Sequence, residues 1–228
     1  MTTFREIDVR CAVCGELQPS LILTSTSSFG PPDLDLRPGG PRRWALPYTV
    51  KRCRRCGYCA RALGEMDVGA DEVVGSPVYR GVLEDSRLPA LARSLFCAAL
   101  LREAADDFDG AGWRFLEAAW ACDDVPDPAQ ARVCRQRAVE MFRRALSTGK
   151  AEATPGVVLT LIADLLRRSR QFDEARAVAA SAERELAELV EDEQFATTVD
   201  IARYIGVLAE VQDDAAHCCG EAFAVDES

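Results

Sequence analysis

Two cysteine hooks constrain the fold of this chain more than any other feature of its sequence. Residues 11–15 and 53–57 both read Cys-x-x-Cys-Gly. A glycine after the second sulfur takes the positive φ that turns backbone N–H groups toward the thiolates. Four sulfurs complete a tetrahedral shell and leave no open position, which predicts one structural Zn²⁺ rather than a catalytic metal. The predicted ligands are Cys11, Cys14, Cys53 and Cys56.

The spacing between the hooks is long for a zinc ribbon. Between Cys14 and Cys53 lie 38 residues, whereas ribbon spacers are usually about 15–20 residues. An insertion in the ribbon loop accounts for the difference. The alternatives are two unrelated cysteine pairs in a reduced protein, or a redox pair of the thioredoxin type. The redox pair is disfavoured because neither hook lies between an apolar strand and a helix.

Charge is distributed unevenly along the 228 residues, which carry a formal net charge of −10. Residues 1–62 hold ten Arg and Lys against five Asp and Glu, whereas residues 63–228 hold 17 against 32. This balance disfavours nucleic-acid binding by the whole protein, but not by the basic ribbon alone. The N-terminus shows no secretory signal pattern and no apolar run is long enough to span a bilayer, so we expect a cytoplasmic protein with reduced thiols.

The remaining sequence predicts an α+β, mostly α protein. Residues 17–26 and 44–51 are expected to pair as the antiparallel strands of the ribbon, with a Pro- and Gly-rich loop between them. From Ser86 the apolar period changes to 3.6, typical of helices. The predicted organisation is a zinc ribbon at 1–62, a connector at 63–86, helical repeats at 87–216 and a tail at 217–228.

The helical region repeats with a period of 37 residues. Ala138, Phe142 and Ala145 recur in spacing as Ala175, Ala179 and Ala182. Small residues let paired helices approach closely while bulky residues fill the gap. The pattern resembles the tetratricopeptide repeat, well at 156–188 and less well at 110–148. A generic pair of amphipathic helices is the alternative, and 195–211 is expected to cover the edge of the last hairpin.

The order of these parts resembles a bacterial protein family of unknown function, in which a zinc ribbon with two cysteine hooks precedes tetratricopeptide-like helices. The matching segments are Cys11-x2-Cys14-Gly, Pro32-Asp-Leu-Asp-Leu-Arg-Pro and Cys53-x2-Cys56-Gly-Tyr-Cys-Ala. The resemblance implies a fold and a metal site. It implies no activity.

Three further groups have side chains capable of chemistry. Cys59 lies just beyond the second hook and is a candidate redox thiol, although a packed cysteine explains it equally. The sequence His217-Cys218-Cys219 contains the only histidine, yet adjacent residues reach one ion poorly. A loop could bind a carboxylate or phosphate through arginine forks, or satisfy its own charges. Its candidate residues are Asp33, Asp35, Arg37, Arg42 and Arg43.

The sequence contains no nucleophile elbow, no phosphate-binding glycine loop and no histidine near a nucleophile, which favours a non-enzymatic role. We therefore expect a zinc-stabilised adaptor that binds a protein or peptide through its helical surface. One alternative is a regulator that binds nucleic acid through the arginines around the second hook. Another is a thiol or zinc redox sensor.

Overall fold

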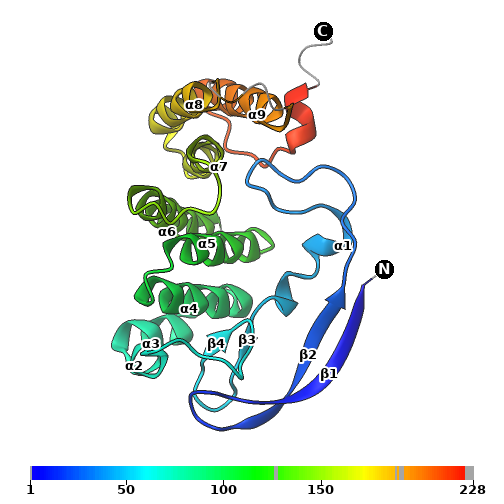
Figure 1. The fold of residues 1–228 in the computed structure, drawn as a ribbon, viewed down its shortest axis with the longest axis vertical. Helices are drawn as coiled ribbons and strands as arrows, with labels where there is room; N and C mark the ends of the chain where they lie inside the picture. The colour runs from blue at the N-terminus through cyan, green and yellow to red at the C-terminus, as the bar shows by residue number, and fades with distance from the viewer. Residues whose placement is uncertain (1, 126–127, 188, 190–192, 224–228) are drawn as a thin grey trace. The chain divides into compact units, whose positions relative to one another are not determined.

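The computed structural model describes residues 2–125, 128–187, 189 and 193–223. Two short antiparallel sheets near the N-terminus are followed by a series of helices, which confirms the predicted α+β, mostly α class (Figure 1). The strands of the described residues are β1 (Thr3–Arg10), β2 (Leu17–Ser25), β3 (Lys51–Arg52) and β4 (Cys59–Ala60).

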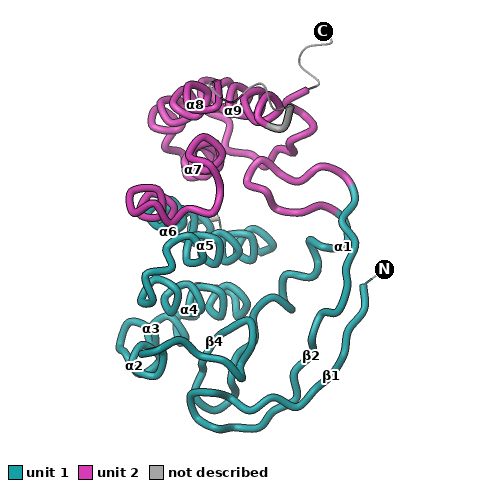
Figure 2. The backbone as a smooth tube through the Cα atoms, in the orientation of Figure 1, with its two compact units in different colours: residues 1–29, 40–141 teal, residues 30–39, 142–228 magenta. Residues whose placement is uncertain are grey.

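The chain divides into two compact units, and neither is continuous in sequence. The first unit comprises residues 1–29 and 40–141, and the second comprises residues 30–39 and 142–228 (Figure 2). A ten-residue stretch of the Pro- and Gly-rich loop therefore belongs with the C-terminal helices rather than with the strands that flank it.

Each cysteine hook forms the turn of its own hairpin. β1 pairs with β2 from Arg10 opposite Leu17, and β3 pairs with β4. The predicted strand at 17–26 is confirmed as β2, but its expected pairing with 44–51 is wrong. Pro47 lacks an N–H donor and lies in the 3-10 helix η1 (Leu46–Tyr48). The strand in this segment, β3, therefore begins only at Lys51.

Helices complete the first unit. Two of them, α2 (Ala70–Gly75) and α3 (Pro77–Glu84), lie in the predicted connector. The longer α4 (Ala90–Ala104) and α5 (Phe108–Asp123) form a hairpin closed by an edge-to-face contact of Phe96 with Phe115. The short α1 (Gly40–Arg43) precedes η1.

The helix α6 (Pro128–Ser147) continues from the first unit into the second. In its first part Arg137 lies over the Phe115 ring and pairs with Glu103 at 2.6 Å, and Arg135 pairs with Asp123 of α5. These contacts attach the first part of α6 to α4 and α5.

The second unit is a helical hairpin with a third helix against it. The elements are α7 (Pro155–Arg168), α8 (Phe172–Ala187), α9 (Glu193–Glu210) and the 3-10 helix η2 (Cys219–Phe223). A Cβ on Gly156 would lie 2.5 Å from Cγ of Leu186, so α7 and α8 approach closely at that position. The repeated small residues are all buried, as the 37-residue pattern predicts: Ala138, Ala145, Ala175, Ala179 and Ala182.

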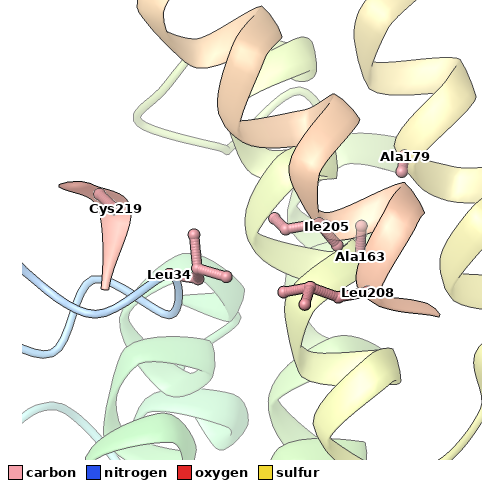
Figure 3. Packing of buried hydrophobic residues seen from close by; sticks show 6 residues of the cluster. All are labelled: Leu34, Ala163, Ala179, Ile205, Leu208 and Cys219. Atoms are coloured by element: carbon pink, nitrogen blue, oxygen red, sulfur yellow. The ribbon is translucent and has the colours of Figure 1, made fainter. Parts of the chain in front are cut away.

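The core of the second unit includes a residue from the 30–39 loop. Leu34, which is 2% exposed, lies against α9 residues Ile205 and Leu208 and against Cys219 (Figure 3). Backbone bonds hold it there, because the Leu34 N–H donates to the His217 carbonyl and the Cys219 N–H donates to the Pro32 carbonyl.

Candidate metal centre and the adjoining cleft

The four hook cysteines lie together. Sγ of Cys11 is 3.7 Å from Sγ of Cys56, and Sγ of Cys14 is 3.6 Å from Sγ of Cys53. All four sulfurs fall within 4.8 Å of one another, and all are free thiols. These separations are too long for disulfide bonds, which are about 2.05 Å. The cluster can therefore hold a metal ion.

The two hooks have matching backbone geometry. Gly15 has φ 74° and Gly57 has φ 76°, which confirms the positive φ expected at both positions. The Gly15 N–H donates to the Cys11 carbonyl at 2.9 Å, and the Gly57 N–H donates to the Cys53 carbonyl at 3.0 Å. Each turn is thus a tight backbone loop that holds two sulfurs on one side.

Backbone N–H groups near the sulfurs influence their proton affinity. Burial raises the pKa of Cys11 and Cys56. Burial acts in the same direction at Cys53, but hydrogen bonds with the N–H groups of Cys56 and Arg55 and with the Cys14 and Cys56 thiols together outweigh it and lower the Cys53 pKa to about 7. The hook geometry thus provides donors for thiolates, the form in which cysteine binds metal.

Residues outside the hooks hold the centre in place. The Gln18 side chain bridges β2 to the second hook, since its Nε2 donates to the Arg52 carbonyl and its Oε1 accepts from the Arg54 N–H. From α3, Tyr79 donates to the Gly57 carbonyl at 3.1 Å and Arg80 donates to the Cys56 carbonyl at 2.9 Å. The sequence gives no signal for the role of Gln18, a polar residue within an apolar strand.

A cleft of about 1180 Å³ adjoins the metal centre within the first unit. Strand residues Ile7, Val9 and Ile22 line it together with the aromatic rings of Tyr48 and Tyr58. Helices α4 and α5 contribute part of the wall. The charged residues of the lining are five cations and three acids: Arg42, Lys51, Arg61, Arg102, Arg114, Glu65, Asp67 and Glu117.

Several groups in this cleft have shifted proton affinities. Burial raises the pKa of Glu117, opposed by Arg114, its ion-pair partner, and by Arg61. Burial also raises the pKa of Tyr58 to about 12, and its hydroxyl donates to the Glu65 carbonyl at 2.7 Å. Lys51 has a pKa lowered by burial. The cleft therefore contains charged groups that are partly withdrawn from water.

Cys59 is fully buried rather than poised at the surface. Its thiol donates to the Gly57 carbonyl at 3.2 Å, and its N–H donates to the Tyr79 hydroxyl at 3.0 Å. Hydrogen bonds with the neighbouring Cys97 thiol lower the pKa of Cys59, and burial opposes that effect. These contacts favour the packed-cysteine interpretation over the redox sensor, because an oxidant needs access to the sulfur.

The predicted ligand loop is divided between the two units. Asp33, Asp35 and Arg37 belong to the second unit, whereas Arg42 and Arg43 belong to the first. Asp35 is 1% exposed, accepts from the Arg37 N–H at 3.2 Å and lies 3.7 Å from Arg168 of α7. The structure thus brings together only part of the set, in a turn where the buried Asp35 is paired with an arginine of the protein itself.

The third candidate group forms a clasp of carboxylates around an imidazole. His217 Nδ1 lies 2.7 Å from Glu221 Oε2, and Nε2 lies 3.0 Å from Asp213 Oδ2. Both ring nitrogens are therefore occupied. The nearby Cys219 contacts the 30–39 loop, because its Sγ donates to the Asp33 carbonyl at 3.4 Å. Among the described residues, only the four hook cysteines form a cluster that could hold a metal ion.

Comparisons of the chain with protein-family models, with curated proteins and with solved structures find no match in any of the three. In the part of the chain that the structure describes, no helix is both long and apolar enough to cross a membrane. The function must therefore be inferred from the metal centre and the cleft themselves.

Proposed function

We propose that this protein is a zinc-stabilised cytoplasmic adaptor that binds a protein or peptide partner in the cleft beside its metal centre. The observation that carries the proposal is that the strands leading into and out of both hooks line one cleft. β1 and β2 contribute Ile7 and Ile22, and the segment of the second hook contributes Lys51, Tyr58 and Arg61. A metal that fixes the hooks therefore also fixes the binding surface.

Zinc is the metal that fits this ligand set best. Sulfurs each about 2.3 Å from a central ion form a tetrahedron with edges of about 3.8 Å. The separations of 3.6 Å and 3.7 Å agree with such edges. Four thiolates fill the shell, so the ion would stabilise the fold and offer no position to a substrate. Bound in this way, Zn²⁺ supplies folding energy rather than Lewis-acid chemistry.

The helical region supports partner binding in a second way. Its repeated spacing resembles tetratricopeptide repeats and the bacterial family with the same order of parts, and such hairpins present extended surfaces to peptides. In this chain α4 and α5 provide Arg102, Arg114 and Glu117 to the cleft. Ten free thiols are consistent with a reducing compartment.

Photo-crosslinking in the cell tests the proposal. A photoreactive amino acid would be placed at Ile22 in the cleft and, as a matched control, at Val133, an exposed apolar residue on α6. We expect a discrete protein adduct from Ile22 alone, together with about one zinc per chain in the purified protein. An adduct destroyed by nuclease, or equal adducts from both positions, would contradict the adaptor function.

A further inference from the structure

We infer that the cleft recognises an acidic, extended polypeptide segment, whose carboxylates bind Arg42, Lys51 and Arg61 while its apolar side chains contact the β1–β2 sheet. This inference rests on the proposed adaptor function and names the chemistry of the partner. Neither the hooks nor the helical repeat pattern predicts it.

The cations of the cleft differ in how far their charge is already neutralised. Arg114 is paired with Glu117, and Arg102 is paired with Asp107 at 3.2 Å. Arg42 and Arg61 are exposed, and within the described residues their side chains form no hydrogen bond or ion pair. These two guanidinium groups have donors available for a ligand carboxylate.

The ammonium group of Lys51 is held in place by Tyr48 and still has N–H donors for a ligand. Its ammonium donates to the Tyr48 carbonyl at 2.8 Å and lies 5.7 Å from the centre of the Tyr48 ring. An ammonium has three N–H donors, so two remain after this bond. Because Lys51 is partly buried, a ligand carboxylate there would interact through less water than at an open surface.

Two acidic residues of the lining, Glu65 and Asp67, reduce the positive charge of the cleft. Glu65 and Asp67 are exposed residues of the segment that follows β4. Asp67 and Arg102 both act on the Tyr58 hydroxyl, with opposite effects on its pKa, so charges partly offset one another around Tyr58. The cations of the cleft without an ion-pair partner among the described residues are Arg42, Lys51 and Arg61, and they carry the positive charge available to a ligand.

The shape of the cleft favours a polypeptide over a small molecule. Its volume of about 1180 Å³ exceeds the range of about 300–1000 Å³ usual for small-molecule sites. Ile7 and Val9 lie two residues apart on β1, which places them on one face of the strand. An extended peptide presents its own alternate side chains at the same period, so apolar residues could contact this face while acidic residues face the cations.

The aromatic residues disfavour single-stranded nucleic acid. Base recognition needs exposed aromatic faces on which bases stack. Tyr58 is only 4% exposed, and the Tyr48 ring is already in contact with Phe4 at a centroid distance of 4.4 Å. The acids Glu65 and Asp67 would also repel a continuous phosphate backbone.

The test uses the full-length, zinc-loaded protein and a fluorescein-labelled octapeptide of alternating glutamate and leucine. Fluorescence anisotropy at low salt measures its affinity beside an octapeptide of alternating lysine and leucine and a thymidine oligonucleotide. We expect the glutamate–leucine peptide to bind, and Arg61→Glu to weaken it about tenfold. Asp67→Lys, which removes a repulsive charge, should strengthen it, and Arg61→Gln should have an intermediate effect.

Arg132→Glu on α6 is the matched control, because it makes the same change of charge outside the cleft lining. An equal loss of affinity in Arg132→Glu would show only a general effect of net charge and would overturn the inference. Tighter binding of the lysine–leucine peptide or of the oligonucleotide, or no binding of the acidic peptide, would also overturn it. In those cases a protein adduct from Ile22 would still support the adaptor function with a partner of different chemistry.

Discussion

The two compact units bury polar groups in contrasting ways. In the first unit, four sulfurs from two hooks meet at one point, and side chains of β2 and α3 satisfy the surrounding carbonyls. In the second unit, Arg167 of α7 is fully buried and contacts Asp164 at 2.6 Å as well as the carbonyls of Asp213 and Ala215. The first unit therefore gathers four sulfurs that can hold an external ion, whereas the second unit neutralises the buried charge of Arg167 with its own residues.

The largest expected effect separates the units by metal dependence. Cys56→Ser, or removal of zinc by a chelator, should unfold the first unit, because structural zinc contributes about 10–16 kcal/mol of apparent binding energy in small fingers. All three tryptophans, Trp44, Trp113 and Trp120, lie in the first unit. We expect their fluorescence to change while hydrogen exchange of α7 and α8 stays slow.

Cys218→Ser, which removes a thiol from the second unit, is the control and should leave zinc content and tryptophan fluorescence unchanged. If Cys56→Ser retained zinc and native fluorescence, the contrast between the units would fail. We expect the helices of the first unit to be disturbed together with the hairpins, because the second hook is hydrogen-bonded to α3 and α4 contacts β4.

The next effect concerns the buried ion pair of the second unit. Arg167→Met leaves Asp164 buried without its arginine, and breaking a buried pair by removing one partner costs about 3–5 kcal/mol. Denaturant unfolding followed by hydrogen exchange of α7 to α9 would measure the loss. The double variant Arg167→Met with Asp164→Leu should recover part of it. Tryptophan fluorescence at low denaturant should be unchanged.

A smaller effect distinguishes the two hooks from each other. Ala at either hook glycine is strained by about 1–2 kcal/mol, because a Cβ disfavours the left-handed region. At Gly57 the new Cβ would also lie 2.6 Å from Cδ1 of Leu83, whereas at Gly15 it meets no atom within 4 Å. Zinc affinity measured by competition with a chelator should therefore fall more for Gly57→Ala than for Gly15→Ala. Equal losses of zinc affinity in the two variants would show that Leu83 of α3 moves aside without cost, and would contradict this prediction.

The smallest effect is a pH dependence confined to the second unit. A protonated His217 donates from both ring nitrogens to Asp213 and Glu221, with Tyr204 and Arg167 also facing the group. The Cys218 N–H and then His217 lower the pKa of Glu221 to about 2. The Ala215 N–H, together with His217, lowers the pKa of Asp213.

Because both carboxyl pKa values are lowered in the folded state, their contribution is complete above about pH 4.5 and is lost as the pH falls toward 2. These groups are partly exposed, so we expect about 1 kcal/mol or less. Hydrogen exchange of residues 213–221 as a function of pH measures it. His217→Gln should reduce the pH dependence, and an unchanged profile in that variant would contradict the role of the clasp.

The sequence predicted the parts of the fold that depend on local chemistry. Hook geometry follows from Cys-x-x-Cys-Gly alone, and the buried positions of the 37-residue pattern follow from helical periodicity. The strand partner of β2 could not be predicted in this way. β2 pairs with β1, the segment on the other side of the first hook, through cross-strand contacts. The only sequence signal for a strand in that segment was the alternation of the apolar residues Ile7 and Val9.

The cleft and the clasp were beyond reach of the sequence for a different reason. In the sequence Arg61 and Ile22 look like ordinary surface residues, and only the folded hooks bring them to the lining of one cleft. Asp35 offered two readings, ligand binding or internal pairing, and only its contact with Arg168 of α7 distinguishes them. Non-local contacts of this kind arise from tertiary packing, which spacing alone does not encode.

The interrupted composition of the second unit has a consequence for the order in which the chain acquires its structure. Leu34 is synthesised well before the residues that cover it, which are Ile205, Leu208 and Cys219. Cys219 is separated by 186 positions from Asp33, to whose carbonyl it donates. A nascent chain therefore exposes the Leu34 loop until these residues have been made. A stop codon a few residues upstream of His217 would remove the two backbone bonds to the loop and the Cys219 contact, and would leave only Ile205 and Leu208 against Leu34.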